Sequence, residues 1–195
     1  MTSSGAVRTL SRQQLVSSAR PTGTPNFRAF SLPSADVDST GRVYVAWMDC
    51  VFRPSCGDGA DLVLARSMPD GARWEPTTRI AVAPQTPGNW YALPGLSVDP
   101  DRQDRLGLAY YRLNAGGAID AFRSTSVDGG RTWSRPTRLT PESIRRSWLP
   151  VTQYGPMIGD YISTSFVNGR LLPVIIVAGP PRGGRLDESA FATLR

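Results

Sequence analysis

The side chains in this sequence that can do chemistry are carboxylates, tyrosines, arginines and two cysteines, because it contains neither histidine nor lysine. Without histidine, a Ser-His-Asp triad, a histidine-ligated zinc site and an imidazole acid or base are excluded. Without lysine, Schiff-base chemistry and a phosphate-binding P-loop are excluded as well. Any catalysis must therefore come from carboxylates, tyrosine, arginine or cysteine.

Arginine supplies all the positive charge of the chain. The 22 basic residues are all arginines, and with 16 acidic residues the formal net charge is +6. Such an excess favours anionic partners such as acidic sugars or phosphates. The alternative is a lysine-poor composition with an ordinary solvated surface. Because only Arg145 and Arg146 form a tight cluster and no motif interleaves arginines with aromatics, we expect no nucleic-acid partner.

Two cysteines and three aspartates raise the question of disulfides and metals. Cys50 and Cys56 flank a polar loop and could form a small disulfide, which would indicate an oxidising compartment; two free thiols are the alternative. Two soft ligands are too few for a structural zinc site. Asp99, Asp101 and Asp104 offer the clustered oxygens that calcium favours, but we interpret them as an ordinary acidic turn. We expect no metal and no cofactor.

Hydrophobic segments of a targeting or membrane-spanning type are absent from the sequence. Residues 1–20 lack the continuous apolar stretch of an export signal. The longest apolar run, residues 171–178, is too short to cross a bilayer and contains Pro173, so we expect a buried strand there and no membrane span.

A repeat organises the elements that must position these side chains. Residues 126–133 read Ser-Val-Asp-Gly-Gly-Arg-Thr-Trp, and about 60 positions earlier residues 67–74 read Ser-Met-Pro-Asp-Gly-Ala-Arg-Trp. Ser, Gly and Trp match in the two octets, while Asp slips by one residue. In the octet at residues 126–133, Asp and Gly suit a tight turn and Trp can close the hairpin. We therefore expect this octet to have a structural role.

The segments that precede the two octets repeat as well. Residues 32–38 match 93–99, residues 41–47 match 104–110, and a third round starts near residues 149–150 and continues through 169–176. Residues 43–48 are largely apolar on both faces, as in a strand that is covered on both sides. Several short strands in a period of about 60 residues indicate the blade of a β-propeller rather than a helical solenoid.

The octet at residues 126–133 matches the Asp-box, or BNR, pattern Ser-x-Asp-x-Gly-x-Thr-Trp at every fixed position. With the stretches 47–56 and 155–162, the chain resembles the sialidase superfamily over about residues 27–190, in particular bacterial secreted exo-alpha-sialidase-type proteins. The resemblance implies an all-β, partial β-propeller of about three four-stranded antiparallel blades with Asp-box hairpins, and an extracellular or cell-surface location. The residues of the two boxes to which it assigns structural roles are Ser67, Asp70, Gly71, Trp74, Ser126, Asp128, Gly130, Thr132 and Trp133.

The repeat divides the chain into four segments. Residues 1–30 form an N-terminal segment that could be the last strand of a missing blade, residues 31–88 blade 1, residues 89–145 blade 2 and residues 146–195 an incomplete blade 3. Because closure in this family takes about twice as many blades, we expect further blades from a longer chain or from a second copy.

The resemblance also implies a set of candidate site residues. The known enzymes use an arginine triad, a Tyr nucleophile assisted by Glu, and an Asp acid/base. Asp49 lies where the acid/base is expected, with a loop-capping carboxylate as the alternative, but Val51 and Ser31 stand where family arginines are expected. The glutamates of the chain, Glu75, Glu142 and Glu188, lie in no recognisable catalytic context. The candidate ligand-binding residues are Arg28, Arg53, Tyr111, Arg112, Asp160 and Tyr161, for some of which strand core and turn are the alternative.

Three functions remain compatible with these residues. The first is a sialidase-like propeller that binds a glycan or another anionic surface ligand without catalysis. The second is an exo-alpha-sialidase with retaining chemistry, a Tyr nucleophile and Asp49 as acid/base. The third is a structural or protein-interaction propeller. The first is the interpretation that we adopt from the sequence.

Overall fold

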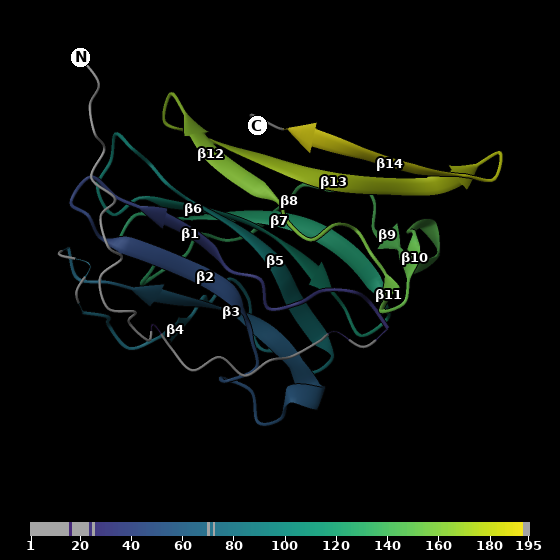
Figure 1. Cartoon of the computed structure of the whole chain (residues 1–195), viewed down its shortest axis with the longest axis horizontal. Coiled ribbons are helices and arrows are strands. Elements are labelled where there is room, and N and C mark those ends of the chain that lie inside the picture. The colour runs from purple at the N-terminus through teal and green to yellow at the C-terminus, as the bar shows by residue number, and fades with distance from the viewer. Residues whose placement is uncertain (1–15, 17–23, 25, 70, 72, 193–195) are drawn as a thin grey trace, which may run out of the picture.

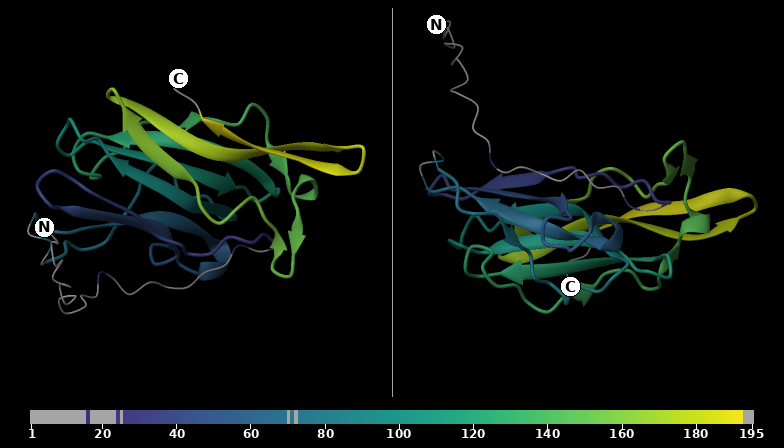
Figure 2. Two further views of the ribbon diagram at one scale, coloured as in Figure 1. Left: turned by 45° about the horizontal axis from the view of Figure 1, so that its top comes forward. Right: turned by 90° about the horizontal axis from the view of Figure 1, so that it is seen from below.

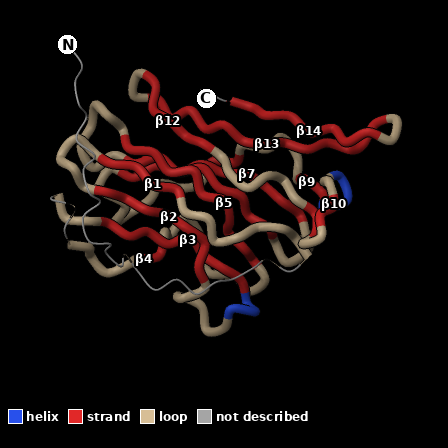
Figure 3. The backbone as a smooth tube through the Cα atoms, in the orientation of Figure 1, coloured by secondary structure: helices blue, strands red, loops and turns tan. Residues whose placement is uncertain are grey.

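The computed structural model describes residues 16, 24, 26–69, 71 and 73–192, and the regular secondary structure of this part of the chain is almost entirely β-strand (Figure 3). Its two helical turns are the short 3-10 helices η1 (Cys56–Asp58) and η2 (Arg146–Trp148). The strands are β1 (Ser34–Val37), β2 (Val43–Asp49), β3 (Gly59–Arg66), β4 (Thr78–Arg79), β5 (Asn89–Val98), β6 (Leu106–Leu113), β7 (Ala118–Ser126), β8 (Thr137–Arg138), β9 (Ile144–Arg145), β10 (Val151–Thr152), β11 (Gly155–Pro156), β12 (Ser163–Val167), β13 (Arg170–Arg182) and β14 (Arg185–Ala192).

Each of the first two sequence repeats folds as a set of four antiparallel strands. β1, β2, β3 and β4 pair in chain order in the first unit, and β5, β6, β7 and β8 do the same in the second, where β9 also pairs with β7. The two units join through a short parallel contact between β3 and β5, with Gly59 opposite Asn89 and Ala60 opposite Trp90. The repeat in the sequence is therefore also a repeat in strand pairing.

The third unit is the antiparallel sheet β12–β13–β14, which lies over β5 and β6 (Figures 1 and 2). Before it, β10 and β11 form a separate short hairpin. The strands of the described residues form no closed ring.

The first strands of the three units lie side by side. The Ser34 hydroxyl on β1 accepts a hydrogen bond from the Leu96 amide on β5 at 2.9 Å, and the Asp36 carboxylate accepts one from the Val98 amide at 2.8 Å. On the other side of β5, the Thr164 hydroxyl on β12 donates to the Gly95 carbonyl at 2.7 Å. Between these three strands, side-chain-to-backbone hydrogen bonds thus take the place of backbone pairing.

Apolar side chains fill the layers between successive units. One core cluster combines residues of the first and second units, among them Tyr44, Leu64, Leu108 and Tyr110. All eight residues of β3 are buried, as expected for a strand that is covered on both faces. A second cluster joins the second unit to the third, to which β13 contributes Ile175.

Only part of the apolar run at residues 171–178 is buried. Within β13, Leu171, Ile175 and Ala178 are buried, whereas Val174 is exposed, because its face of the sheet has no covering layer among the described residues. Gly107 allows the closest contact of this sheet with the second unit, since a Cβ atom there would lie 2.1 Å from a methyl carbon of Leu171. The described part of the chain contains no helix with the length and apolarity needed to cross a membrane.

Candidate functional site

The turn at residues 126–133 is held by its own side chains. The Ser126 hydroxyl donates to the Asp128 carboxylate at 2.7 Å and accepts a hydrogen bond from the Gly130 amide at 2.8 Å. Asp128 also accepts hydrogen bonds from the backbone amides of Arg131 and Thr132, at 3.0 and 2.9 Å, and from the Thr132 hydroxyl. Burial alone would raise the pKa of Asp128, but these hydrogen bonds lower it to about 2.

The same turn packs against the first unit. Gly130 has a φ of 82°, and a Cβ atom there would lie 2.3 Å from a methyl carbon of Leu64. The Trp133 indole N–H donates to the Gly130 carbonyl at 3.2 Å, and the ring packs against the core between the first two units. These contacts are structural, and none of them leaves a group available for a ligand.

The related turn at residues 67–74 lies at the equivalent point of the first unit. Ser67 and Trp74 form an isolated bridge, and the Ser67 hydroxyl accepts a hydrogen bond from the Val43 amide at 2.8 Å. The Gly71 amide donates to the Met68 carbonyl at 2.9 Å. Asp70, which the sequence assigns to this turn, lies outside the described residues.

Asp49 and the two cysteines lie in the connection between β2 and β3. Cys50 and Cys56 form the disulfide that the sequence offers as one alternative, with Cα atoms 5.1 Å apart. Asp49 is 1% exposed, and its carboxylate accepts hydrogen bonds from the Trp47 indole at 3.0 Å and the Val51 amide at 2.8 Å. In this arrangement Asp49 caps the loop, and a substrate would have to displace these contacts to reach it.

Arg53 is engaged within the protein. Its guanidinium forms a two-pronged ion pair with Asp61, with N–O distances of 2.8 and 2.9 Å, and donates to the Thr86 carbonyl at 3.0 Å. Both side chains of the pair are 2% exposed. Through these contacts Arg53 connects the disulfide loop to β3 and to the segment before β5, so it stabilises the fold.

Tyr111 and Arg112 on β6 also have protein partners. The Tyr111 hydroxyl donates to the Ile176 carbonyl at 2.7 Å and accepts from the Ile176 amide at 2.8 Å, and burial raises the pKa of this tyrosine. Arg112 pairs with Asp120 at 3.3 Å and lies over the Phe122 ring at 4.7 Å from its centroid. The structure therefore does not bring these two residues together with Arg28 or Asp49.

Arg28 and Asp160 are the two predicted ligand residues that the structure places in direct contact. The Arg28 guanidinium bonds to the Asp160 carboxylate at 3.1 Å and also contacts the Met157 sulfur. The Arg28 amide donates to the Pro156 carbonyl at 2.8 Å, which holds this segment against the β10–β11 hairpin. The side chains of the pair are 22% and 32% exposed, so both can reach solvent.

Two exposed aromatic rings extend from the Arg28 side of this ion pair. Arg28 lies 5.6 Å from the centroid of the Phe30 ring, and Phe30 meets Tyr154 edge to face with ring centroids 5.8 Å apart. Phe30 and Tyr154 are 38% and 60% exposed. Tyr161, the remaining predicted ligand residue, follows Asp160 directly and is 71% exposed. We call the group Arg28, Phe30, Tyr154, Met157 and Asp160 the Arg28 site.

A pocket of about 290 Å³ adjoins the Arg28 site through Met157. It is lined by Pro150, Met157, Ile158, Gly159, Ile176, Glu188, Ser189 and Ala190. Burial raises the pKa of Glu188 in this largely apolar setting. Sequence reasoning missed Phe30, Tyr154 and Met157 as parts of one site, because no local pattern connects residues that are more than a hundred positions apart.

The Arg28 site combines the groups that sugar recognition needs. A guanidinium and a carboxylate offer paired donors and acceptors to hydroxyl or carboxylate groups, and exposed rings offer a flat apolar surface to the C–H face of a pyranose. Among the described residues, no group of three or more histidine, cysteine, aspartate or glutamate side chains could hold a metal ion.

Comparison with known proteins found similarity in structure only. No family model and no curated protein matches the chain. A Hadza microbial sialidase is 16% identical, with a TM-score of 0.49 over 77% of this chain and 33% of the sialidase. A protein of unknown function from Dyadobacter fermentans is 18% identical, with a TM-score of 0.48 over 88% of this chain and 52% of that protein.

A mutant of NanB sialidase from Streptococcus pneumoniae is 9% identical, with a TM-score of 0.48 over 92% of this chain and 46% of the sialidase. The chain thus spans between a third and about half of the length of these three proteins. Since all three TM-scores lie below 0.5, our description of the fold rests on the strand pairing given above.

Proposed function

We propose that the chain is part of a sialidase-like β-propeller that binds a glycan at the Arg28 site without catalysing its hydrolysis. Residues 31–88 and 89–145 are two of its blades and residues 146–195 an incomplete third, with Asp-box turns at residues 67–74 and 126–133. In support, the first two segments each contain a set of four strands that pair antiparallel in chain order, and β1, β5 and β12 lie side by side. An extracellular or cell-surface location agrees with the disulfide between Cys50 and Cys56.

The observation that carries the proposed binding function is the partly exposed Arg28–Asp160 pair beside two exposed aromatic rings. A buried pair would be committed to the fold, as Arg53 and Asp61 are. Here both charges remain accessible, and the net charge of +6 favours the approach of acidic sugars. The absence of catalysis is proposed because Asp49 is buried and caps its own loop.

Calorimetric titration with 3′-sialyllactose and with lactose tests this function. Arg28→Gln removes the guanidinium, and Tyr154→Ala removes one of the rings. We expect each change to weaken binding about tenfold, because a hydrogen bond to a charged group or a stacked ring contributes about 1.5 kcal/mol. Arg102→Gln, which removes an exposed arginine in the β5–β6 turn, is the matched control and should bind as the wild type does.

Asp160→Asn distinguishes an acidic from a neutral sugar. Without the Asp160 charge, Arg28 is free to pair with a ligand carboxylate, so an acidic sugar binds more tightly. A neutral sugar loses a charged acceptor and binds more weakly. The proposal is refuted if neither sugar binds saturably, or if Arg28→Gln and Tyr154→Ala leave binding unchanged.

Turnover of a fluorogenic sialoside tests the proposed absence of catalysis. We expect no release of fluorophore by the wild-type chain. Turnover that Asp49→Asn abolishes would overturn this part of the proposal and support the exo-alpha-sialidase alternative.

A further inference from the structure

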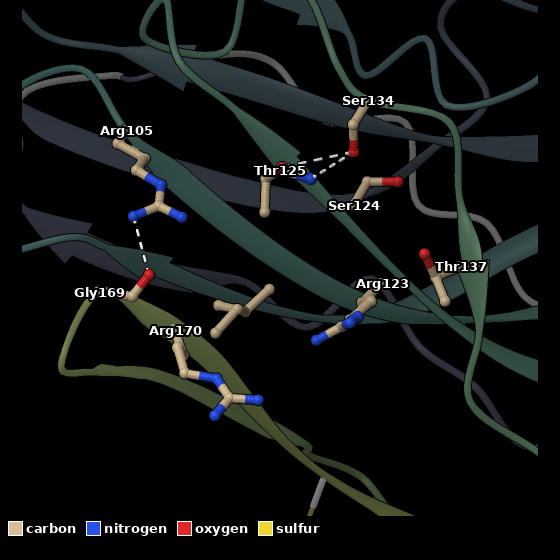
Figure 4. Close-up of a pocket in the computed structure, with 9 residues that line it drawn as sticks. Arg105, Arg123, Ser124, Thr125, Ser134, Thr137, Gly169 and Arg170 are labelled. Carbon is tan, nitrogen blue, oxygen red and sulfur yellow. Dashed lines mark hydrogen bonds between the residues drawn. The ribbon is translucent and has the colours of Figure 1, made fainter. Parts of the chain in front are cut away.

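Three arginines line a second pocket, of about 280 Å³, which lies between the second and third units (Figure 4). It is lined by Arg105, Arg123, Ser124, Thr125, Ser134, Thr137, Gly169, Arg170 and Leu171. Strand β12 separates it from the Arg28 site, since Asp160 precedes that strand while Gly169 and Arg170 follow it. No acidic residue is among the described lining residues, although Asp99, which lies outside the lining, pairs with Arg105.

Arg105 is fixed in place by the fold. Its guanidinium pairs with Asp99 at 2.7 Å, donates to the Gly169 carbonyl at 2.9 Å and lies over the Phe166 ring at 5.0 Å from its centroid. These contacts tie the start of β6 to the β12–β13 turn. The turn is held further by Leu171, which packs into the space that Gly107 leaves on β6. The geometry of this side of the pocket is therefore preorganised.

Arg123 stands on the facing side of the pocket, in β7. Its backbone pairs with Thr137 of β8, and Figure 4 shows its guanidinium directed toward the β12–β13 turn. Its guanidinium makes no hydrogen bond or ion pair with the described residues, although the side chain is only partly exposed. An anion in the pocket would supply this guanidinium with a partner of opposite charge.

Hydroxyl groups complete the wall beside Arg123. The Thr125 and Ser134 side-chain oxygens are 3.4 Å apart, and the Thr125 amide donates to the Ser134 hydroxyl at 3.0 Å. Guanidinium forks bind the oxygens of phosphate and sulfate through paired hydrogen bonds, and hydroxyl groups add further donors. A volume of about 280 Å³ suits one such group rather than a whole oligosaccharide.

We infer that this pocket is an anion site that binds a tetrahedral oxyanion, either as a free ion or as the end group of a phosphate or sulfate ester. The inference is independent of the proposed function, because none of the lining residues belongs to the Arg28 site. The chemistry is recognition without reaction: no bond is formed or broken, and the anion pairs with the Arg123 guanidinium.

Amide chemical shifts of the isotope-labelled chain test the site during titration with inorganic phosphate, inorganic sulfate or chloride at constant ionic strength. We expect phosphate and sulfate to shift the amide signals of Thr125, Gly169 and Leu171 saturably, and chloride to leave them in place. Phenyl phosphate and phenyl sulfate then distinguish the two sources of the group. Tighter binding of the esters identifies an end group, and tighter binding of the inorganic ions identifies a free anion.

Arg123→Gln should weaken phosphate binding at least fivefold. Arg123→Lys, which keeps the charge but loses the paired N–H donors of the guanidinium, should weaken it less. Arg185→Gln, which removes an exposed arginine at the start of β14, is the matched control for net charge and should stay within twofold of the wild type. Equal effects of Arg123→Gln and Arg185→Gln, or the lack of saturable shifts with phosphate and sulfate, would overturn the inference.

Discussion

Replacement of Asp128 by asparagine tests whether the turn at residues 126–133 depends on a carboxylate. Asp128 accepts hydrogen bonds from the Ser126 hydroxyl, from two backbone amides and from the Thr132 hydroxyl. Asparagine keeps one acceptor oxygen, replaces the other with an amide donor and loses the charge. We therefore expect Asp128→Asn to destabilise the fold at neutral pH.

The size of the effect follows from the pKa of Asp128, which falls from an ordinary value of 3.8 to about 2 in the folded chain. Without any reduction for solvent screening, this difference in pKa corresponds to about 2.4 kcal/mol of stability. The turn is partly exposed, and solvent screening reduces the contribution to about 1 kcal/mol. Because the folded pKa is the lower one, the stabilisation is present above pH 4 and is lost as the pH falls toward 2.

Urea denaturation at a series of pH values between 6 and 2 measures this contribution. The free energy of unfolding of the wild type should exceed that of Asp128→Asn by about 1 kcal/mol at pH 6, and the gap should close toward pH 2. Val127→Ala alters an exposed side chain in the same turn and should keep the pH dependence of the wild type. A gap that does not change with pH would refute the reasoning, because the asparagine would then act through shape rather than charge.

Three further changes address the contacts that hold the units together. Arg53→Met leaves the buried Asp61 carboxylate with only the Gln85 amide at 2.7 Å and the Arg79 guanidinium at 3.8 Å, so we expect a loss of about 3 kcal/mol in urea denaturation, and native-like stability would contradict the importance of the pair. Gly107→Ala forces apart the second and third units and should cost about 1–2 kcal/mol; an unchanged melting temperature would show that the contact adapts freely. Reduction of the disulfide between Cys50 and Cys56 opens a short loop and should cost about 2 kcal/mol, as measured by denaturation with and without reductant.

Features that depend on neighbouring residues could be predicted from the sequence. The apolar run at residues 43–48 indicated a strand covered on both faces, and β2 lies there with most of its residues buried. The cysteine spacing offered the disulfide that the structure contains. The all-β character of the chain followed from the same local signals and is confirmed.

Features that depend on distant residues could not be predicted in the same way. Arg28 and Asp160 were each expected to bind a ligand, but their ion pair joins positions separated by 132 residues, and no periodic pattern encodes that contact. Tyr154 lies next to Phe30 because the β10–β11 hairpin packs against the segment before β1, which is a tertiary event. The sequence predicts Arg53 at a ligand site, yet the loop that carries it folds back so that its guanidinium pairs with Asp61 on β3, and this loop conformation is not encoded in a local pattern.

The contact between β3 and β5 involves two opposed residue pairs, whereas each unit is internally joined by long antiparallel ladders. Most backbone hydrogen bonds therefore join residues that are fewer than about 60 positions apart in the sequence. Each unit can form its own strand pairs as it leaves the ribosome. Cooperativity then depends on the side-chain layers between neighbours, as in other linear arrays with nearest-neighbour coupling. Amide hydrogen exchange should consequently be slower within the ladders than at the seam of residues 59–60 and 89–90.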